Sequence, residues 1–352
     1  MNVRLMSAAD EGLWDAYVMG SGASNCYHLT GWKNVIERTF GKSKKTFYLL
    51  AEGPGAGAGP GKLEGILPLV RLKSILFGNY LVSMPYFNYG GICAETPAAE
   101  RELLDAAIKI ASDEGADHVE MRHTRPMDLG LEEKMAKVSM RLALPETPGE
   151  LWKSFPSKLR NQIGRPAKEG MTVRAGGREE LAGFYHVFSA NMRDLGTPVY
   201  PRDFFRNILD EFPGRAWIIT VRSREGLPVA SGFFAGFKDT VEIPWASSLR
   251  SHNRYGPNML LYWTGLETAC EKGFKVFDFG RSTPGEGTYR FKEQWGARPI
   301  QLHWHYWLKD GGPLPEINKE NPKYRMSIKV WQKLPVSLTR LIGPAISGDL
   351  PW

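Results

Sequence analysis

Apolar and polar positions follow the same order in two parts of the chain. Each part contains two strand patterns that form a hairpin, then a third strand, a helix and a further strand. In the first part these elements are predicted at 45–51, 63–72, 80–85, 97–114 and 117–121. In the second part they are predicted at 217–222, 229–237, 240–247, 257–272 and 275–279. The sequence therefore predicts an internal repeat of one mixed strand-and-helix unit.

Start and stop signals support both helices of the repeat. Thr96 is placed to cap the first helix, Pro97 fits its first turn, and Gly115 would end it. In the second helix, apolar residues at helical spacing indicate a face buried in the core, and a cofactor site there is the weaker interpretation. These residues are Met259, Trp263, Leu266 and Cys270.

The segments outside the repeat also suggest helices. Between the copies, Thr147 is placed to cap a helix, a basic helix is predicted over 157–170, and another over 179–192. After residue 313 the chain carries six Lys or Arg against three acidic residues. We therefore expect domains at 1–145 and 146–312, followed by a basic, helical tail at 313–352. This tail would either dock on its own domain or lie on a membrane surface.

Composition narrows the possible partners and the compartment. The 352 residues carry a net charge of +7, which favours an anionic partner such as a phosphorylated cofactor, a nucleotide-linked substrate, tRNA or anionic lipid. Mild basicity without a specific partner is the alternative, and we expect no DNA partner. The three cysteines are far apart, and the sequence has neither a signal peptide nor a transmembrane run, so we expect a cytoplasmic protein. The glycine-rich run 53–61 fails the phosphate-loop pattern and predicts a hairpin loop.

The segment 278–296 carries the clearest chemical signal. An apolar strand that contains Asp278 leads into a loop with Gly280, Pro284 and Gly287. A cationic, aromatic stretch follows, with Tyr289, Arg290, Phe291, Lys292 and Trp295. A strand that ends in such a loop is a common way to present anion-binding or reactive groups at the edge of a sheet.

Several motifs together resemble the FemAB/FemX family of tandem GNAT-fold acyltransferases. The motifs are Arg254 to Tyr262, Phe277 to Arg281, Gly287 to Lys292, Tyr27 to Trp32 and the basic helix at 157–170. The resemblance implies an α+β fold of two tandem GNAT-like domains, with mixed central sheets flanked by helices. It is closer to the FemAB-related proteins of exosortase (PEP-CTERM) exopolysaccharide systems, because the chain leaves no room for the long helical arm of other relatives. The acyl-CoA loop of ordinary GNAT enzymes is reduced to Gly256, which leaves the acyl donor open.

The resemblance also implies a reaction. We expect transfer of an acyl or aminoacyl group, from acyl-CoA or aminoacyl-tRNA, to an amine of a cell-envelope or exopolysaccharide precursor. The sequence has no Gly-x-Ser-x-Gly motif and no recognisable Cys/His pair, so direct transfer without a covalent enzyme intermediate is expected. The acceptor would be an anionic small molecule or a lipid-linked substrate, with tRNA and the inner face of the cytoplasmic membrane as further partners left open. The alternative function is a non-catalytic binding module of an envelope-assembly complex.

Three residues are candidates for catalysis. Lys292 matches the Phe–Lys pair of the family and would place a positive charge at a phosphate or an oxyanion, whereas a solvated lysine is the alternative. Glu242, within an apolar strand, would accept the proton of the amine, or would simply face outward. Tyr289 would donate a proton or pack in the core.

Six further residues are candidates for substrate binding. Phe291 adjoins Lys292. Arg281 directly follows the end of a predicted strand and would bind a phosphate or carboxylate unless it pairs with Asp278 or Glu286. Asn258 would cap or line the start of a helix. The remaining candidates, Lys33, Arg160 and Arg165, would hold the diphosphate of an acceptor, or would form solvated helix faces. His303 and His305 alternate on a predicted strand without matching ligands, so we expect no metal.

Overall fold

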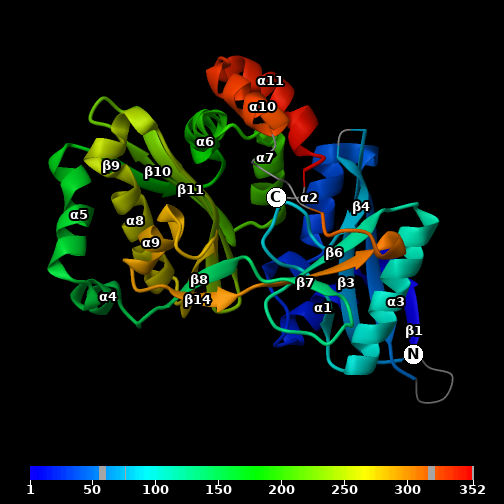
Figure 1. Ribbon diagram of the computed structural model, residues 1–352. Helices are drawn as coiled ribbons and strands as arrows, with labels where there is room; N and C mark the ends of the chain where they lie inside the picture. The colour runs from blue at the N-terminus through cyan, green and yellow to red at the C-terminus, as the bar shows by residue number, and fades with distance from the viewer. Residues whose placement is uncertain (55–60, 76, 316–321, 351–352) are drawn as a thin grey trace. The chain divides into compact units, whose positions relative to one another are not determined.

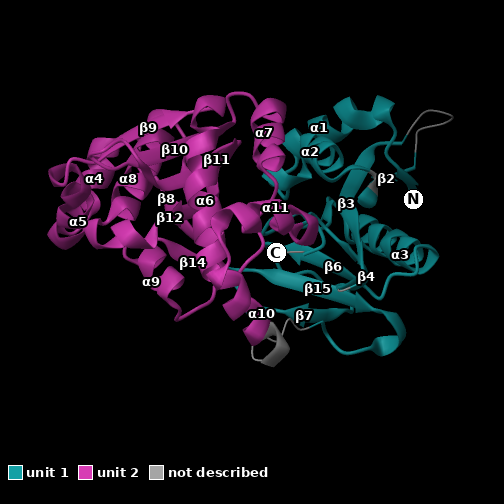
Figure 2. Cartoon of the chain, turned by 90° about the horizontal axis from the view of Figure 1, so that it is seen from above, with its two compact units in different colours: residues 1–137, 301–316, 348–352 teal, residues 138–300, 317–347 magenta. Residues whose placement is uncertain are grey.

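The computed structural model describes residues 1–54, 61–75, 77–315 and 322–350. The chain forms two compact units, each with its own sheet (Figures 1 and 2). Unit 1 comprises residues 1–137, 301–316 and 348–352, and unit 2 comprises residues 138–300 and 317–347. The predicted glycine-rich hairpin loop falls mostly on residues 55–60, outside the described part of the chain.

Unit 1 is built on an eight-stranded sheet within the described residues. Its strand order is β1-β2-β3-β4-β6-β15-β7, and β5 pairs with β3. The strands are β1 (Asn2–Leu5), β2 (Lys45–Glu52), β3 (Leu63–Ser74), β4 (Gly78–Val82), β5 (Cys93–Ala94), β6 (His118–His123), β7 (Glu132–Lys134) and β15 (His303–Leu308). The helices are α1 (Glu11–Gly20), α2 (Gly31–Phe40) and α3 (Pro97–Asp113).

Unit 2 is built on a seven-stranded sheet within the described residues, in the order β14-β8-β13-β12-β11-β10-β9. The strands are β8 (Val138–Ala143), β9 (Thr172–Gly176), β10 (Ala216–Arg222), β11 (Pro228–Phe237), β12 (Thr240–Ser248), β13 (Val276–Ser282) and β14 (Arg298–Gln301). The helices are α4 (Pro148–Ser154), α5 (Ser157–Lys168), α6 (Leu181–Leu195), α7 (Arg202–Glu211), α8 (Pro257–Glu271), α9 (Gly287–Glu293), α10 (Pro322–Lys333) and α11 (Val336–Ser347).

The two units repeat one topology, as the sequence pattern predicted. In unit 1, β2, β3 and β4 are antiparallel neighbours, and α3 crosses over to β6, which runs parallel to β4. In unit 2, β10, β11 and β12 are antiparallel neighbours, and α8 crosses over to β13, which runs parallel to β12. The predicted caps are also present, because the side chains of Thr96 and Thr147 accept backbone hydrogen bonds at the starts of α3 and α4.

The boundaries of the units differ from those expected at residues 145 and 312. Strand β8 precedes residue 145 but pairs with β13 in the sheet of unit 2. Strand β15 lies within 146–312 but pairs with β6 and β7 in the sheet of unit 1. The tail is helical as expected, but α10 and α11 belong to unit 2, whereas 348–352 belongs to unit 1. A strand pattern specifies which face is buried and does not specify the partner strand, so these exchanges were not predictable.

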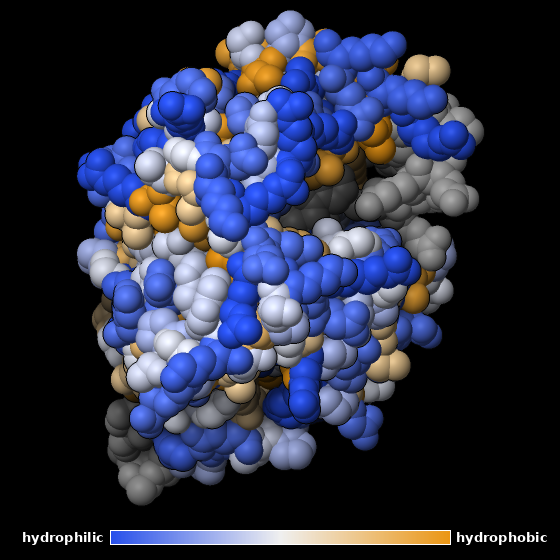
Figure 3. Space-filling view, turned by 90° about the vertical axis from the view of Figure 1, so that its left-hand side faces the viewer, coloured by the Kyte–Doolittle hydropathy of each residue, from blue (hydrophilic) through white to orange (hydrophobic). Residues whose placement is uncertain are grey.

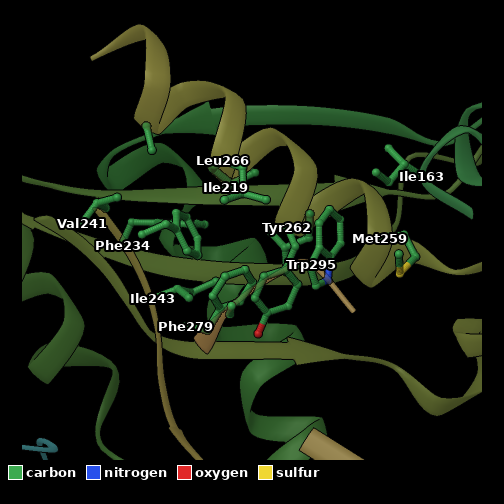
Figure 4. Close-up of a cluster of buried hydrophobic side chains, with 14 of the residues drawn as sticks. Ile163, Ile219, Phe234, Val241, Ile243, Met259, Tyr262, Leu266, Phe279 and Trp295 are labelled. Atoms are coloured by element: carbon green, nitrogen blue, oxygen red, sulfur yellow. The ribbon is translucent and has the colours of Figure 1, made fainter. Parts of the chain in front are cut away.

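Helices cover both faces of the sheet in unit 2. On one face, α8 packs on β10 and β11, and α4 and α5 pack on α8. The core on this side contains Ile163, Tyr262, Leu266, Phe234 and Trp295, all buried (Figure 4). The predicted helical face of α8 is confirmed, since Met259, Leu266 and Cys270 are buried and Trp263 packs against them. On the other face, Phe184 of α6 and Phe205 of α7 form an aromatic cluster with Trp245 of β12.

Candidate active site

The parallel strands of unit 2 separate at the centre of the sheet. β12 and β13 pair at only three positions, of which the last is Glu242 with Asp278. Beyond this pair the register between β11 and β12 shifts, because the segment from Glu242 to Trp245 is one residue longer than the facing segment of β11. Pro244 lies in this bulge, where its missing N–H costs no ladder hydrogen bond. The bulge turns β12 away from β13 and opens the sheet next to two carboxylates.

Lys292 projects from α9 to this opening. Its Nζ donates hydrogen bonds of 2.9 Å to the carbonyl oxygens of Gly280 and Arg281 on β13. The side chain is buried, with 7% of its surface exposed. Burial lowers the pKa of Lys292 to about 8, although the nearby charges of Asp278 and Glu242 oppose this change. The ammonium is therefore mostly charged at neutral pH, and it has a third N–H with no acceptor among the described residues.

Aromatic contacts hold the short helix α9 in place. Phe291 contacts the ring of Tyr262 edge-on, with centroids 5.0 Å apart. Trp295, one turn further on, contacts Phe155 in the same way at 5.6 Å. Because Lys292 lies between these two anchors, its position is fixed by packing on the core of unit 2. The sequence pattern indicated a cationic, aromatic stretch here, but it did not indicate that 287–293 is helical.

The two carboxylates at the opening have different surroundings. Asp278 is fully enclosed by hydrogen bonds from Ser139 Oγ at 2.6 Å, Arg141 Nε at 2.9 Å and the Gly280 N–H at 2.8 Å. Glu242 is also buried, with 5% of its surface exposed, and lies beside Asp278 on the same face because the two residues are in register. Hydrogen bonds from β8 and from the Gly280 N–H thus fix Asp278 at the end of the paired segment, and Glu242 lies next to it at the opening.

A pocket of about 320 Å³ lies at the start of α8, within unit 2. Three of the predicted substrate-binding residues, Arg165, Asn258 and Phe291, line it. The other lining residues are Gln162, Asn253, Arg254, Gly256, Pro257, Met259 and Gln294. The pocket thus joins two arginines to the N-terminal end of a helix, a combination that favours anions.

The backbone at this pocket differs from a phosphate-binding loop. The N–H of Gly256 already bonds to the carbonyl of Asn253 at 3.0 Å, and Pro257 has no N–H. Of the two alternatives for Asn258, capping the helix does not hold, because Gly256 is the N-cap residue. Asn258 lines the pocket instead. Its Nδ2 donates to Ser248 Oγ at 3.1 Å, and its buried Oδ1 has no hydrogen-bond partner among the described residues.

The other predicted site residues lie in varied surroundings. Tyr289 is half-buried and packs against the core of unit 2. Arg281 lies in β13, where its backbone is in register with Ser139 of β8, and the Asp278 carboxylate forms an ion pair with Arg141. Arg160 lies half-buried on α5 and is not among the pocket residues. The α5–α4 face of unit 2 is largely hydrophilic (Figure 3).

Lys33 belongs to unit 1. Its Nζ is 2.9 Å from a carboxylate oxygen of Glu37, one turn further along α2. The solvated-helix alternative accounts for this contact, and a role in acceptor binding stays a prediction.

Several residues that build the site were not identified from the sequence. Asp278 was weighed only as an ion-pair partner, although a lone carboxylate inside an apolar strand was a usable signal. Ser139 and Arg141 carried no signal, because they lie in β8, far from β13 in the sequence. Arg254 stood in a family-like motif but was given no role.

The equivalent position in unit 1 is filled by the protein itself. β4 and β6 also pair at three positions, ending at Val82 with Glu120. Beyond them, the fully buried guanidinium of Arg122 donates to Glu120 Oε1 at 2.6 Å and to the carbonyl oxygen of Phe87. It also lies 4.4 Å from the ring centroid of Trp304. The opening in unit 2 holds the ammonium of Lys292 instead, which has an N–H without an acceptor among the described residues.

The two alternating histidines of β15 are both engaged. His305 Nδ1 lies 3.0 Å from Nδ1 of His123, and His303 Nδ1 lies 2.6 Å from Glu133 Oε1. The described part of the chain contains no cluster of three or more His, Cys, Asp or Glu side chains suited to a metal ion.

Comparison with known proteins gives this geometry a context. Residues 154–293 match the family model described as an acetyltransferase (GNAT) domain. The solved structure of FemX superimposes with a TM-score of 0.65 at 16% identity, covering 86% of this chain and 97% of FemX. The chain therefore contains two GNAT folds in tandem. It has the α+β architecture of two mixed sheets that the sequence predicted.

Two further relatives extend the likeness. A tandem GNAT protein from the clavulanic acid biosynthesis pathway superimposes with a TM-score of 0.57 at 14% identity, covering 89% of this chain and 99% of that one. A UDP-N-acetylmuramoylpentapeptide-lysine N(6)-alanyltransferase of Weissella viridescens is 23% identical over 131 residues. That match spans 36% of this chain and only 38% of the relative. Within the described residues, no helix combines the length and apolar character needed to cross a bilayer.

Proposed function

We propose that unit 2 transfers an acyl or aminoacyl group directly to an amine. The observation that carries the proposal is the buried Lys292 at the opening between β12 and β13, beside Glu242 and next to an arginine-lined pocket. The match to a GNAT domain over the same residues supports it. The ammonium has a free N–H for a developing oxyanion, and a charge fixed in a water-poor site stabilises such an anion strongly.

Each step of the reaction has a candidate group. The neutral amine attacks the carbonyl carbon of the donor, a C–N bond forms, and the carbonyl oxygen takes the negative charge. Lys292 faces that oxyanion, and Glu242 accepts the proton that the nitrogen must lose. The bond to the leaving group then breaks, and the leaving group takes up a proton, which we assign to Tyr289.

The pocket is proposed to hold the phosphates of the donor. Arg165 and Arg254 supply two cations, and Asn258 and Phe291 supply a polar and an aromatic wall. Because the backbone N–H groups of an acyl-CoA loop are absent or used, side chains must carry phosphate binding here. The helix α5 has four Lys or Arg and no acidic residue, which suits an extended polyanion. Of the two expected donors, aminoacyl-tRNA is therefore favoured over acyl-CoA.

The acceptor is proposed to be an amine of a cell-envelope precursor. The alanyltransferase of Weissella viridescens is named for a lysine of a UDP-linked muramoyl pentapeptide, which is such an amine. The narrower likeness to exopolysaccharide proteins of exosortase systems would place the acceptor on a different envelope polymer. In both cases the reaction would take place at the cytoplasmic side of the membrane, and Arg160 of unit 2 would contact the anionic acceptor.

A transfer assay with matched variants tests the proposal. Labelled alanyl-tRNA and acetyl-CoA are each supplied with UDP-N-acetylmuramoyl pentapeptide, and product is followed by mass spectrometry. The Lys292→Met variant should lose roughly 10²–10³-fold in rate, the cost of removing one oxyanion donor. The Lys275→Met variant, which changes an exposed lysine of the same unit, should retain full activity. Equal rates for both variants would remove Lys292 from the mechanism.

The rival function is a binding module that kept the fold without catalysis. The altered backbone at Gly256 and Pro257 is the observation that favours it. In that case alanyl-tRNA or the UDP-linked pentapeptide should raise the melting temperature, while no transfer product forms with any donor. A ligand at about 100 times its dissociation constant would add roughly 2.7 kcal/mol to the stability of the protein.

A further inference from the structure

The helical hairpin of α10 and α11 docks on unit 2 with an unusual orientation. Both helices contact α6. The side of α11 that is buried carries the small residues Thr339, Gly343 and Ser347, one turn apart. A Cβ added to Gly343 would lie 2.9 Å from the backbone nitrogen of Val199, so this contact needs a residue without a side chain. The fully buried positions of this helix are therefore small residues, and Ile342 and Ile346 are half-buried.

The opposite side of α11 presents its apolar residues to solvent. Leu341 is 76% exposed and Leu338 is 39% exposed, and Ala345 is exposed one turn beyond Leu341. Arg340, the single charged residue of α11, is turned inward, where its Nε donates to Ser189 Oγ at 2.7 Å. A helix that docks on its own domain normally buries its large apolar side chains and exposes its charges. In α11, by contrast, Leu341 is the most exposed large apolar side chain, and the charged Arg340 is turned inward.

The neighbouring helix α10 adds a row of cations. Arg325, Lys329 and Lys333 recur every four residues, are exposed, and form no ion pair among the described residues. Met326 and Val330 are also exposed, at 63% and 53%, about 100° further round the helix. The sequence from 322 to 347 contains five Lys or Arg and no acidic residue. Apolar and hydrophilic side chains lie next to each other at the top of the molecule, where these helices are located (Figures 1 and 3).

We propose that the exposed side of α10 and α11 binds the surface of a membrane that contains anionic lipid. Such a surface offers negative head groups to the row of cations and an acyl layer to Leu338 and Leu341. A nucleic acid would leave the leucines without a partner. A second copy of the same surface would bring two identical cationic rows together, which is unfavourable. The inference is independent of the proposed reaction, because none of these residues lies in the active site.

Vesicle co-flotation with the full chain tests this inference. The wild type should bind vesicles of phosphatidylcholine with 30% phosphatidylglycerol and should bind pure phosphatidylcholine far more weakly. Replacing Arg325, Lys329 and Lys333 with Gln should lower the partition coefficient about 100-fold, at roughly fivefold for each cation. A control with the same change in charge at exposed residues elsewhere, Lys109, Lys275 and Lys309, should bind as the wild type does.

The apolar contribution is tested separately. The Leu341→Asp variant should bind at least tenfold more weakly, because an exposed leucine can no longer enter the acyl layer. Leu227→Asp, at an exposed leucine elsewhere in unit 2, is the matched control. Circular dichroism melts should be unchanged in every variant, since all the substituted residues are exposed. The inference would be overturned if the triple Gln variant of α10 and Leu341→Asp of α11 both bound vesicles as the wild type does. It would also be overturned if light scattering showed a dimer that Leu341→Asp abolishes.

Discussion

The buried ammonium of Lys292 should make stability depend on pH in a defined window. Its pKa is lowered from 10.5 to about 8 in the folded protein, a difference of about 2.5. At about 1.36 kcal/mol per pKa unit, burial of the charged form costs about 3 kcal/mol. Between pH 8 and 10.5 the unfolded chain binds the proton more tightly than the folded protein. The folded protein should therefore gain stability as the pH rises through this window.

A difference measurement isolates this contribution from all other titrating groups. The free energy of unfolding in urea is measured by tryptophan fluorescence at several pH values from 7 to 11, for the wild type and for Lys292→Met. The wild-type value minus the variant value should rise by up to about 3 kcal/mol between pH 8 and 10.5. The same subtraction with Lys275→Met, an exposed lysine, should stay flat. A flat or falling curve for Lys292→Met would show that the ammonium is not buried at the strand opening.

Three further predictions concern the fold. Gly265→Ala should destabilise unit 2 by about 1–3 kcal/mol, because a Cβ would lie 2.6 Å from the ring of Phe234. Gly164→Ala should stabilise unit 2 by up to about 1 kcal/mol, because its Cβ would meet no atom within 4 Å. Calorimetry compares the two variants. Burial lowers the pKa of His123 well below 6.5. As the pH drops below 6.5, the free energy of unfolding from urea titration should therefore decrease more steeply for the wild type than for His123→Phe. Thr96→Ala should cost about 1 kcal/mol in the same titration and Thr96→Ser much less, and equal losses would refute the cap.

Much of the fold was predictable because its signals are local. Alternation of apolar residues identified the three antiparallel strands of each unit, and Thr96 with Pro97 identified the start of α3. The parallel partners β6 and β13 followed from the helix that precedes each of them. Helix α9 was missed because Gly285 and Gly287 signal a loop, and its seven residues are held by the aromatic contacts of Phe291 and Trp295.

The candidate site was predictable only in part. Arg165, Asn258 and Phe291 were chosen from separate segments, and the structure brings them to one pocket. The burial of Lys292 was beyond sequence reasoning, since a lone lysine is usually solvated and only its packed neighbours exclude water from it. The surroundings of Asp278 depend on Ser139 and Arg141, which contact its carboxylate. Both residues lie in β8, which neighbours β13 in the sheet but is far from it in the sequence.

The exchange of strands has a consequence for anyone who cuts this chain in two. A fragment that starts at residue 146 would lack β8. Asp278 would then lose the hydrogen bonds from the Ser139 hydroxyl and the Arg141 guanidinium, which neutralise its charge. It would also keep β15 with neither of its neighbours β6 and β7, leaving two unsatisfied edges open to aggregation. The sheet of unit 1 is completed by β15, which follows every strand of unit 2 in the chain, so unit 1 has to be made, and inherited, together with unit 2.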